Sequence, residues 1–222
     1  MKKIIAKFII AIIVTVLFGM VITSCADRSE KSGKEPMQEK LKLVSMSPNI
    51  TQIVFALGLG DLLIGVDDYS VYPPEAKSIP RMGSLMKPNL ELLAKSKPDL
   101  VLVVNTDENL IRMLDGIGIN HAEFGHNTTG EVIDCIRRLG DILNRKARAD
   151  AIIGNFNNAV NEIKAKLENE KPTSVALVVG RTPGRLEDII FAGQGSFLDE
   201  LISLSGGVNI FSDAKIRWPQ AG

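Results

Sequence analysis

Residues 146–170 read KARADAIIGNFNNAVNEIKAKLENE, a stretch without proline. Its large apolar side chains recur every three or four residues, at Ile152, Phe156, Val160, Ile163 and Leu167. This spacing predicts one long amphipathic α-helix, which at about 1.5 Å per residue spans roughly 35 Å. A helix of that length can run across a whole lobe and into a second one, and Pro172 ends it.

Upstream of this helix, short apolar runs alternate with helical patterns. The predicted strands are residues 42–46, 62–66, 100–104 and 119–124, and the predicted helices are residues 50–57, 89–95, 108–114 and a segment beginning near Thr128. Strands alternating with helices indicate crossover connections and a mostly parallel sheet covered on both faces. We therefore expect an N-terminal α/β lobe over residues 41–143.

We assign the long helix and its flanking residues to 144–171 and call this segment the backbone helix. A C-terminal α/β lobe is predicted downstream of it, over residues 172–222. A strand begins there at residues 174–179, a helix follows at residues 196–204, and Gly206-Gly207 stops the helix. One or two strands and a single helix bury little apolar surface. We therefore expect this second lobe to be incomplete. The predicted fold class is α/β, with two lobes of mostly parallel sheet joined by one long α-helix.

The N-terminus has the pattern of a bacterial export signal over residues 1–24. Three lysines precede an apolar run at residues 8–21, and this run of about 14 residues is shorter than the roughly 20 that span a bilayer. Small residues precede Cys25, as in the lipobox of bacterial lipoproteins, so we expect cleavage there and lipidation of Cys25. The alternative is an uncleaved membrane anchor. Either way, the rest of the chain lies outside the cytoplasm, on the periplasmic side or at the cell surface.

The segment after Cys25 is polar and the rest of the chain is slightly acidic. Residues 25–40 are rich in Ser, Lys and Glu and cannot bury enough apolar surface to fold, so they are predicted to be a flexible tether. The chain from Cys25 onward has 23 basic and 26 acidic residues, a net charge of about −3, and no concentrated basic face for nucleic acid. If Cys25 is lipidated, Cys135 has no disulfide partner, and its helical, apolar setting predicts a buried thiol.

Candidate ligand-binding residues follow from the predicted topology, because ligands of open parallel sheets bind beyond the carboxyl ends of the strands. Polar or aromatic residues stand at these ends, and the scarce polar aromatics fall on loops: Tyr69, Tyr72 and Trp218. Such rings either line a surface for a bulky ligand or pack against their own loops.

Several segments together resemble a known family. They are SMSPNITQIVFALG at 45–58, GVDDYSVYPPEA at 65–76, PNLE at 88–91, KPDLV at 97–101, GGVNIF at 206–211 and WPQ at 218–220. In this order they resemble the substrate-binding proteins of bacterial ABC importers for cobalamin, siderophores and haem, the class with a helical backbone between its lobes. The last two segments are most similar to the cobalamin-binding branch.

The resemblance implies that a ligand is held between the two lobes. Tyr69 and Trp218 match aromatic residues that contact a corrinoid, whereas a further aromatic position is Leu85 here. Glu91 matches one of two acidic residues that dock on the membrane permease, and the second position would lie just past Gly222. The candidate ligand-binding residues are therefore Ser47, Pro48, Asn49, Tyr69, Leu85, Asn105, His126, Arg181 and Trp218.

Other kinds of site fit the sequence less well. His121 and His126 are the only histidines, too few for a transition-metal site, although His126 could be a polar contact to the ligand. Arg181 and Arg185 either hold anionic groups of a ligand or are solvated loop residues. Gly58-Leu59-Gly60 closes a helix instead of opening one, so it does not indicate a dinucleotide site.

We therefore expect a lipid-anchored, monomeric substrate-binding component of an ABC importer, working with a permease and its ATPase and having no cofactor of its own. The ligand would be a corrinoid, a ferric siderophore or haem. One alternative is a membrane-anchored sensor or scaffold with the same fold. An extracytoplasmic α/β hydrolase is the other, but the chain lacks a Gly-x-Ser-x-Gly motif and has only two histidines.

Overall fold

The computed structural model describes residues 40–105, 108–185 and 187–221. The predicted signal peptide, the lipidation site at Cys25 and nearly all of the predicted tether lie outside the described residues. Within the described part of the chain, no helix combines the length and the apolar character needed to cross a membrane.

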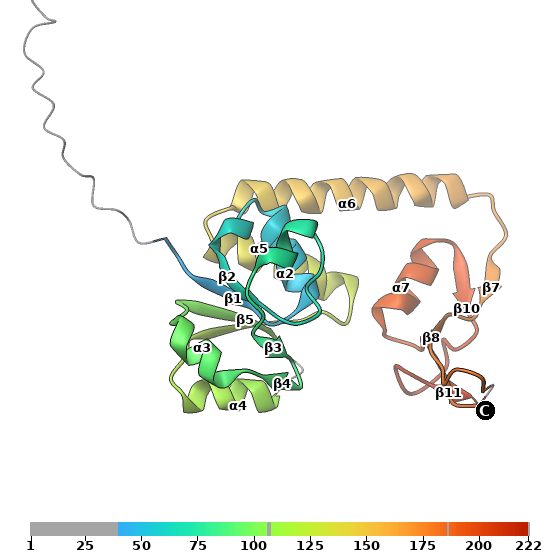
Figure 1. Cartoon of the computed structure of the whole chain (residues 1–222). Coiled ribbons are helices and arrows are strands. Elements are labelled where there is room, and N and C mark those ends of the chain that lie inside the picture. Colours follow the sequence, from blue (N-terminus) through green and yellow to red (C-terminus); the bar gives the residue numbers. More distant parts are fainter. Residues whose placement is uncertain (1–39, 106–107, 186, 222) are drawn as a thin grey trace, which may run out of the picture. The chain divides into compact units, whose positions relative to one another are not determined.

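The first lobe is built on a four-stranded parallel sheet with strand order β2-β1-β5-β6. Helices cover both faces of this sheet (Figure 1). The strands are β1 (Leu43–Ser45), β2 (Leu63–Val66), β5 (Leu100–Val104) and β6 (His121–Phe124), and the helices are α2 (Pro48–Ala56), α3 (Leu90–Ser96), α4 (Glu108–Gly116) and α5 (Thr129–Ile142). The sequence-based expectation of a parallel α/β lobe is therefore confirmed.

The run LVLVV of β5 is apolar throughout because both of its faces are buried. Leu102 and Val104 belong to a core cluster with α2 and α5, whereas Val101 and Val103 belong to a second cluster with α3 and α4. All four side chains are at most 3% exposed. Since successive side chains of a strand point to opposite faces, a central strand between two helical layers needs an unbroken apolar sequence.

Short elements that the sequence did not predict connect these parts. Two 3₁₀ turns, η1 (Gly60–Leu62) and η2 (Pro74–Ser78), flank β2, and a small antiparallel hairpin pairs β3 (Gly83–Ser84) with β4 (Lys87–Pro88). The hairpin is too short for a period of two residues to be visible in the sequence. Gly83 is required there, because it has φ +86° and an added Cβ would lie 2.4 Å from the carbonyl oxygen of Lys87.

The predicted backbone helix is α6 (Lys146–Leu167), a single helix of 22 residues. Its first turns pack on α5, where an added Cβ on Gly140 would lie 2.5 Å from the Cβ of Ala149. At its other end, Leu167 lies against Gly206 of the second lobe. The apolar stripe between these ends remains partly exposed, with Phe156 36% and Ile163 42% accessible.

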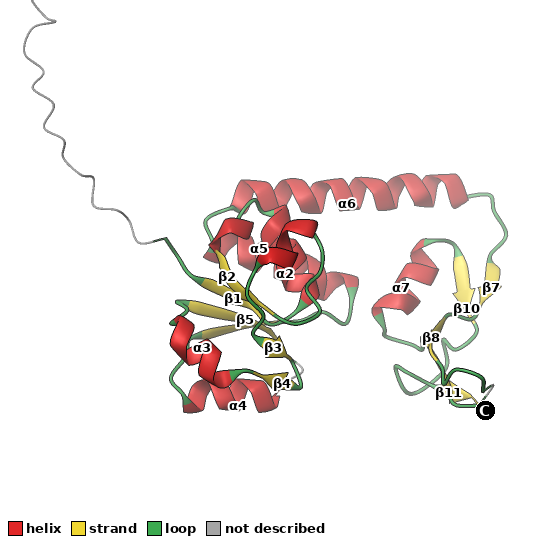
Figure 2. Ribbon diagram, viewed as in Figure 1, coloured by secondary structure: helices red, strands yellow, loops and turns green. Residues whose placement is uncertain are grey.

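The second lobe holds strands of two or three residues in two small sheets (Figure 2). Its elements are β7 (Thr173–Val175), β8 (Val178–Gly180), β9 (Ile189–Phe191), α7 (Phe197–Leu204), β10 (Gly207–Asn209) and β11 (Gln220–Ala221). The pair β10-β7 is parallel, whereas the sheet β11-β9-β8 is antiparallel.

The prediction of one strand over residues 174–179 is wrong. The chain forms two strands there, which join different sheets: Val175 pairs with Asn209 of β10, and Val178 pairs with Phe191 of β9. Between them, the Leu177 carbonyl accepts a hydrogen bond from the amide of Ala192. The strand partners lie far along the chain, so the local sequence pattern does not reveal the break.

Candidate functional site

The loops that follow β1, β2, β5 and β6 lie at one edge of the first sheet, because all four strands run in the same direction. Ser47, Pro48 and Asn49 follow β1 and begin α2, and the Ser47 hydroxyl donates to the side-chain oxygen of Asn49. Asn105 follows β5, and its amide donates to the carbonyl of Phe124 at the end of β6. The structure thus gathers these predicted residues at the carboxyl edge of the sheet.

Beneath this edge, buried hydroxyl groups tie α2 to the loop after β2. The Thr51 hydroxyl lies 2.9 Å from the Ser45 hydroxyl and 2.8 Å from the Ser70 hydroxyl. Ser70 in turn donates to the carboxylate of Asp67, which is only 2% exposed. Because buried polar groups are stable only when they are paired, this chain of hydrogen bonds fixes the loop's conformation.

The same loop presents Tyr69 to solvent. Asp67 accepts a hydrogen bond from the Tyr69 amide at 3.0 Å, and Arg81 donates to the carbonyls of Asp67 and Ser70 at 2.9 and 2.8 Å. The backbone on both sides of Tyr69 is therefore held, while the residue itself is 70% exposed. A large ring on a rigid loop can contact a ligand without a large loss of conformational entropy.

The β3–β4 hairpin lies next to this loop, since the amide of Asp68 donates to the carbonyl of Gly83 at 3.0 Å. Leu85, in the hairpin turn, is partly buried and packs against both core clusters of the first lobe. The adjacent Met86 is 85% exposed. In the hairpin turn, the side chain of Met86 is therefore more exposed to solvent than that of Leu85.

The two histidines lie at opposite ends of β6. His126 follows the carboxyl end of the strand, and its Nδ1 atom is buried without a hydrogen-bond partner. His121 starts the strand, and its two ring nitrogens each lie 3.7 Å from a carboxylate, that of Asp115 or that of Glu123. Among the described residues, no group of three His, Cys, Asp or Glu side chains is arranged to hold a metal ion.

In the second lobe, hydrogen bonds to the β9 region fix the segment that carries Trp218. The Pro219 carbonyl accepts from the amide of Phe191, and the Arg217 carbonyl accepts from the amide of Gly193, both at 2.9 Å. Gly193 allows this close approach, because an added Cβ would lie 2.6 Å from the carbonyl oxygen of Ile216. Trp218 is 44% exposed.

Arg181 is exposed just after β8, but it is not adjacent to Trp218 along the sheet. Gly180 of β8 and Gln220 of β11 both pair with Ile190, on opposite sides of β9. Arg181 comes one residue after Gly180, whereas Trp218 comes two residues before Gln220. Because β8 and β11 run in the same direction, these residues lie toward opposite ends of the small sheet, and only a large ligand could contact both.

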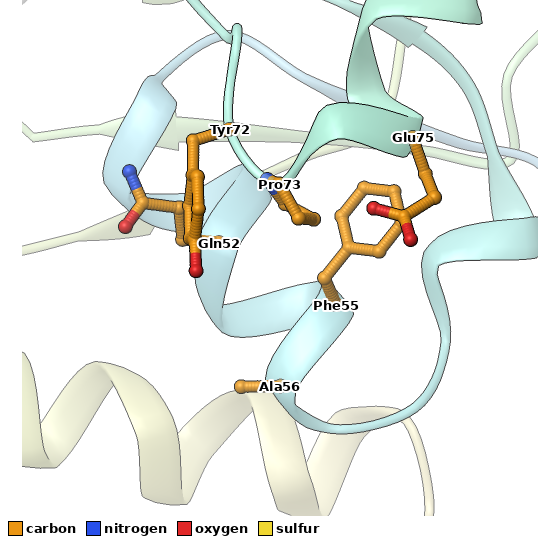
Figure 3. Close-up of a pocket in the computed structure, with 6 residues that line it drawn as sticks. All are labelled: Gln52, Phe55, Ala56, Tyr72, Pro73 and Glu75. Atoms are coloured by element: carbon orange, nitrogen blue, oxygen red, sulfur yellow. The ribbon is translucent and has the colours of Figure 1, made fainter.

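A hollow lies beside the candidate edge, between α2 and the loop after β2 (Figure 3). It measures about 430 Å³, and Tyr72 and Pro73 approach Gln52 and Phe55 there. A second, apolar hollow of about 350 Å³ shares Tyr72 and Gln52 and continues between α2, α5 and α6. Tyr72 lines both hollows, which together form a groove. No local sequence pattern reveals this groove, because its walls come from the loop after β2 and from three separate helices.

The two remaining predicted residues are Glu91 on α3 and Cys135 on α5. Glu91 is exposed in the first turn of α3, where Asn89 caps the helix by accepting from the amide of Leu92 at 2.9 Å. Cys135 is buried in the core, and burial raises the pKa of its thiol to about 12. A thiol with such a pKa is protonated and unreactive at neutral pH.

Comparison with known sequences gives the family of this chain. The family profile described as periplasmic binding protein matches residues 43–222. The chain is 31% identical to a vitamin B12-binding protein of Yersinia pestis (strain Pestoides F) over 191 residues, and 28% identical to one of Vibrio cholerae serotype O1 (strain ATCC 39541) over 181 residues. These matches cover 83% and 81% of this chain, but only 65% and 64% of the two relatives.

Solved structures share the fold of this chain. The periplasmic vitamin B12-binding protein of Vibrio cholerae has a TM-score of 0.70 at 27% identity, and a periplasmic haem-binding protein of the same organism has 0.72 at 22%. Each match covers 82% of this chain and 70% of the other chain. Because the family profile matches residues 43–222, which span both lobes, the chain belongs to the periplasmic binding protein family.

Proposed function

We propose that this chain is the substrate-binding component of an ABC importer and that it holds a corrinoid, or a ligand of the iron-siderophore type, between its two lobes. Its relatives in Yersinia and Vibrio are vitamin B12-binding proteins, which favours the corrinoid. One similar structure is a haem-binding protein, so haem is a competing ligand.

The observation that carries this proposal is the exposure of Tyr69 and Trp218 on backbone that is held by hydrogen bonds. The two residues are 70% and 44% exposed in a chain with only one tryptophan and two tyrosines. Flat aromatic side chains suit the large, largely apolar surface of a macrocyclic ligand. Ser47, Asn49, Asn105, His126 and Arg181 would fix the ligand's orientation through hydrogen bonds, while Pro48 and Leu85 would supply apolar contact.

Binding without catalysis is part of this proposal. The buried, protonated thiol of Cys135 is not available as a nucleophile. His121 lies between two carboxylates at the start of β6, away from the carboxyl edge of the sheet. These positions support a binding protein over the hydrolase alternative.

Delivery completes the proposed role. The tether at residues 25–40, lipidated at Cys25, would keep the monomeric protein at the outer side of a membrane. Glu91, exposed at the start of α3, would meet basic groups of the permease. The sensor or scaffold alternative shares the anchor and the fold but requires no delivery of ligand.

Fluorescence titration tests the function, because Trp218 is the chain's only tryptophan. Cyanocobalamin, haemin and a ferric siderophore would be added separately to the purified protein. We expect saturable quenching by cyanocobalamin, since a stacked macrocycle quenches an indole. Saturable quenching by haemin alone would reassign the ligand, and no response to any of the three would favour the sensor or scaffold.

Free tryptophan at matched absorbance is the control for light absorbed by the ligands themselves. Equilibrium dialysis of each ligand provides a measurement that does not depend on fluorescence. A ligand that quenches the protein and free tryptophan equally, and that dialyses freely, does not bind.

A further inference from the structure

A carboxylate of the second lobe binds the start of a helix in the first lobe. The Oε2 atom of Glu200, in the first turn of α7, accepts hydrogen bonds from the amide of Thr129 at 2.6 Å and from the Thr129 hydroxyl at 2.5 Å. The two residues are 71 positions apart in the sequence. We call this pair of hydrogen bonds the Glu200–Thr129 clasp.

The neighbouring groups at the start of α5 are already paired locally. The Thr128 hydroxyl caps the helix by accepting from the amide of Glu131 at 3.1 Å, and the Glu131 carboxylate accepts from the amide of Asn127 at 2.7 Å. Neither of these local bonds involves the Thr129 amide, which Glu200 satisfies. A negative charge at the amino end of a helix of 14 residues is also favoured by the helix dipole.

The position of Glu200 on α7 is held from within the second lobe. Ser196 caps α7 by accepting from the amide of Asp199 at 3.1 Å, and Asp199 accepts from the side-chain amide of Asn209 at 2.8 Å. Asn209 is only 3% exposed. Asp199 is thus used inside the second lobe, whereas its neighbour Glu200 is directed to the first lobe.

The clasp links the lobes in addition to α6, which is continuous with both lobes and also contacts α7. A single long helix can bend or swing at its ends, whereas a second attachment restricts that motion. The clasp engages the residue three positions after His126, at the edge of the sheet where the candidate ligand residues lie.

We propose that Glu200 is a positioning residue: by bonding to Thr129 it holds the ligand-free lobes at the spacing that a ligand requires. Tyr69 and Trp218 remain 70% and 44% exposed while the clasp is formed, so the clasp does not cover the aromatic residues. If the lobes could separate, only a fraction of the molecules would be ready to bind, and the apparent affinity would fall by that fraction. A protein that already holds its lobes in the binding conformation avoids this loss. The benefit to ligand binding rests on the proposed function, whereas the restraint on the ligand-free lobes can be tested without any ligand.

The first experiment measures the clasp in the ligand-free protein. In the Glu200→Ala variant we expect amide exchange of Thr129, followed by NMR, to be at least about tenfold faster, because its acceptor is lost. We also expect a larger radius of gyration by small-angle X-ray scattering. Glu200→Gln, which keeps an acceptor but loses the charge, should show a smaller effect. Unchanged exchange and unchanged radius in Glu200→Ala would overturn the proposal.

Glu162→Ala is the matched control, because Glu162 is an exposed glutamate on α6. This variant should leave both measurements as in the wild type. Thr129→Val removes only the hydroxyl bond, so it should show part of the effect of Glu200→Ala. Thr129→Ser keeps a hydroxyl, so its radius of gyration should equal that of the wild type. If Thr129→Val also behaves like the wild type, the hydroxyl bond has no role in the clasp.

The second experiment uses cyanocobalamin as the probe and rests on the proposed function. We expect Glu200→Ala to bind it up to about tenfold more weakly, with no further loss when Thr129→Val is added, since both changes break one contact. Equal or tighter binding by Glu200→Ala would overturn the positioning role. If the wild type does not bind cyanocobalamin, the proposed function fails, and the ligand-free measurements alone decide the clasp.

Discussion

Trp218 combines two properties that rarely occur together, a large apolar surface and an exposed position on constrained backbone. The hydrogen bonds of Arg217 and Pro219 to the β9 region fix the segment, so the ring's exposure follows from the fold. If the ring stacks on a ligand, Trp218→Ala should weaken binding by about 1 to 3 kcal/mol. Equilibrium dialysis of cyanocobalamin measures this loss without relying on indole fluorescence.

Trp218→Phe is the comparison for that measurement, because it keeps a ring at the same position. We expect it to recover part of the lost affinity. If Trp218→Ala binds as tightly as the wild type, Trp218 does not contact the ligand.

Cys135 illustrates how burial removes the reactivity of a side chain. Burial is the largest cause of its raised pKa. The charge of Arg138 lowers the pKa by a smaller amount, and the charge of Asp134 raises it. At pH 8 we expect alkylation of Cys135 by iodoacetamide to be at least about 100-fold slower in the native protein than in urea. Mass spectrometry of the peptide that contains Cys135 measures both rates, and similar rates would show that the thiol is accessible.

The same pKa shift makes stability depend on pH in the alkaline range. The folded thiol has a pKa of about 12, above its usual 9.0. Above pH 9 the unfolded chain therefore loses this proton first, and the free energy of unfolding falls as the pH rises toward 12. Below pH 9 the thiol contributes no pH dependence. In Cys135→Ala, urea unfolding at several pH values should show a smaller decline over this window.

Where α5 and α6 pack on each other, a glycine permits the close approach. Gly140 of α5 has no room for a Cβ, since that atom would lie 2.5 Å from the Cβ of Ala149. Gly154 of α6 is different, because an added Cβ there would meet no atom within 4 Å. Packing therefore requires glycine at 140, whereas nothing near Gly154 excludes a side chain.

Alanine substitutions at these two positions should have opposite effects. Gly154→Ala should raise the free energy of unfolding by about 0.5 to 1 kcal/mol, because alanine loses less backbone entropy in a helix. Gly140→Ala should lower it by about 1 kcal/mol or more, because the packed helices must move apart. Urea unfolding of both variants measures the difference, and stabilisation by Gly140→Ala would contradict the packing described here.

The two lobes differ in how much apolar surface they bury. Both hydrophobic core clusters lie within residues 43–153, and in the described second lobe the buried apolar side chains are those of Ala192, Ile202 and Pro219. Large apolar residues there remain about half exposed, among them Val178, Val208 and Ile210. Local stability should therefore be lower in the second lobe.

Hydrogen exchange followed by mass spectrometry tests this difference across the whole chain. We expect amides of β1 and β5 to exchange at least about 100-fold more slowly than those of β7 to β10, because the first lobe opens only with its core. Peptides from α6 should be protected most near Ala149 and Ile153, its two buried residues. Equal protection in both lobes would mean that they unfold as one cooperative unit.

The sequence by itself determined the features that depend on neighbouring residues. The spacing of apolar residues predicted α6, the unbroken run LVLVV predicted β5, and the alternation of strands and helices predicted the parallel first lobe. The sequence also placed Tyr69 and Trp218 on loops, where they are exposed. These predictions succeeded because periodicity and turn residues act over a few positions along the chain.

Only the tertiary structure decided features that depend on contacts between distant residues. Strand partners from two sheets divide residues 173–180 into β7 and β8. Core packing partly buries Leu85 and leaves Met86 exposed, and three helices form the groove beside Tyr72. Glu200 meets Thr129 across 71 positions. No local pattern encodes such contacts, since each is set by how whole elements pack together.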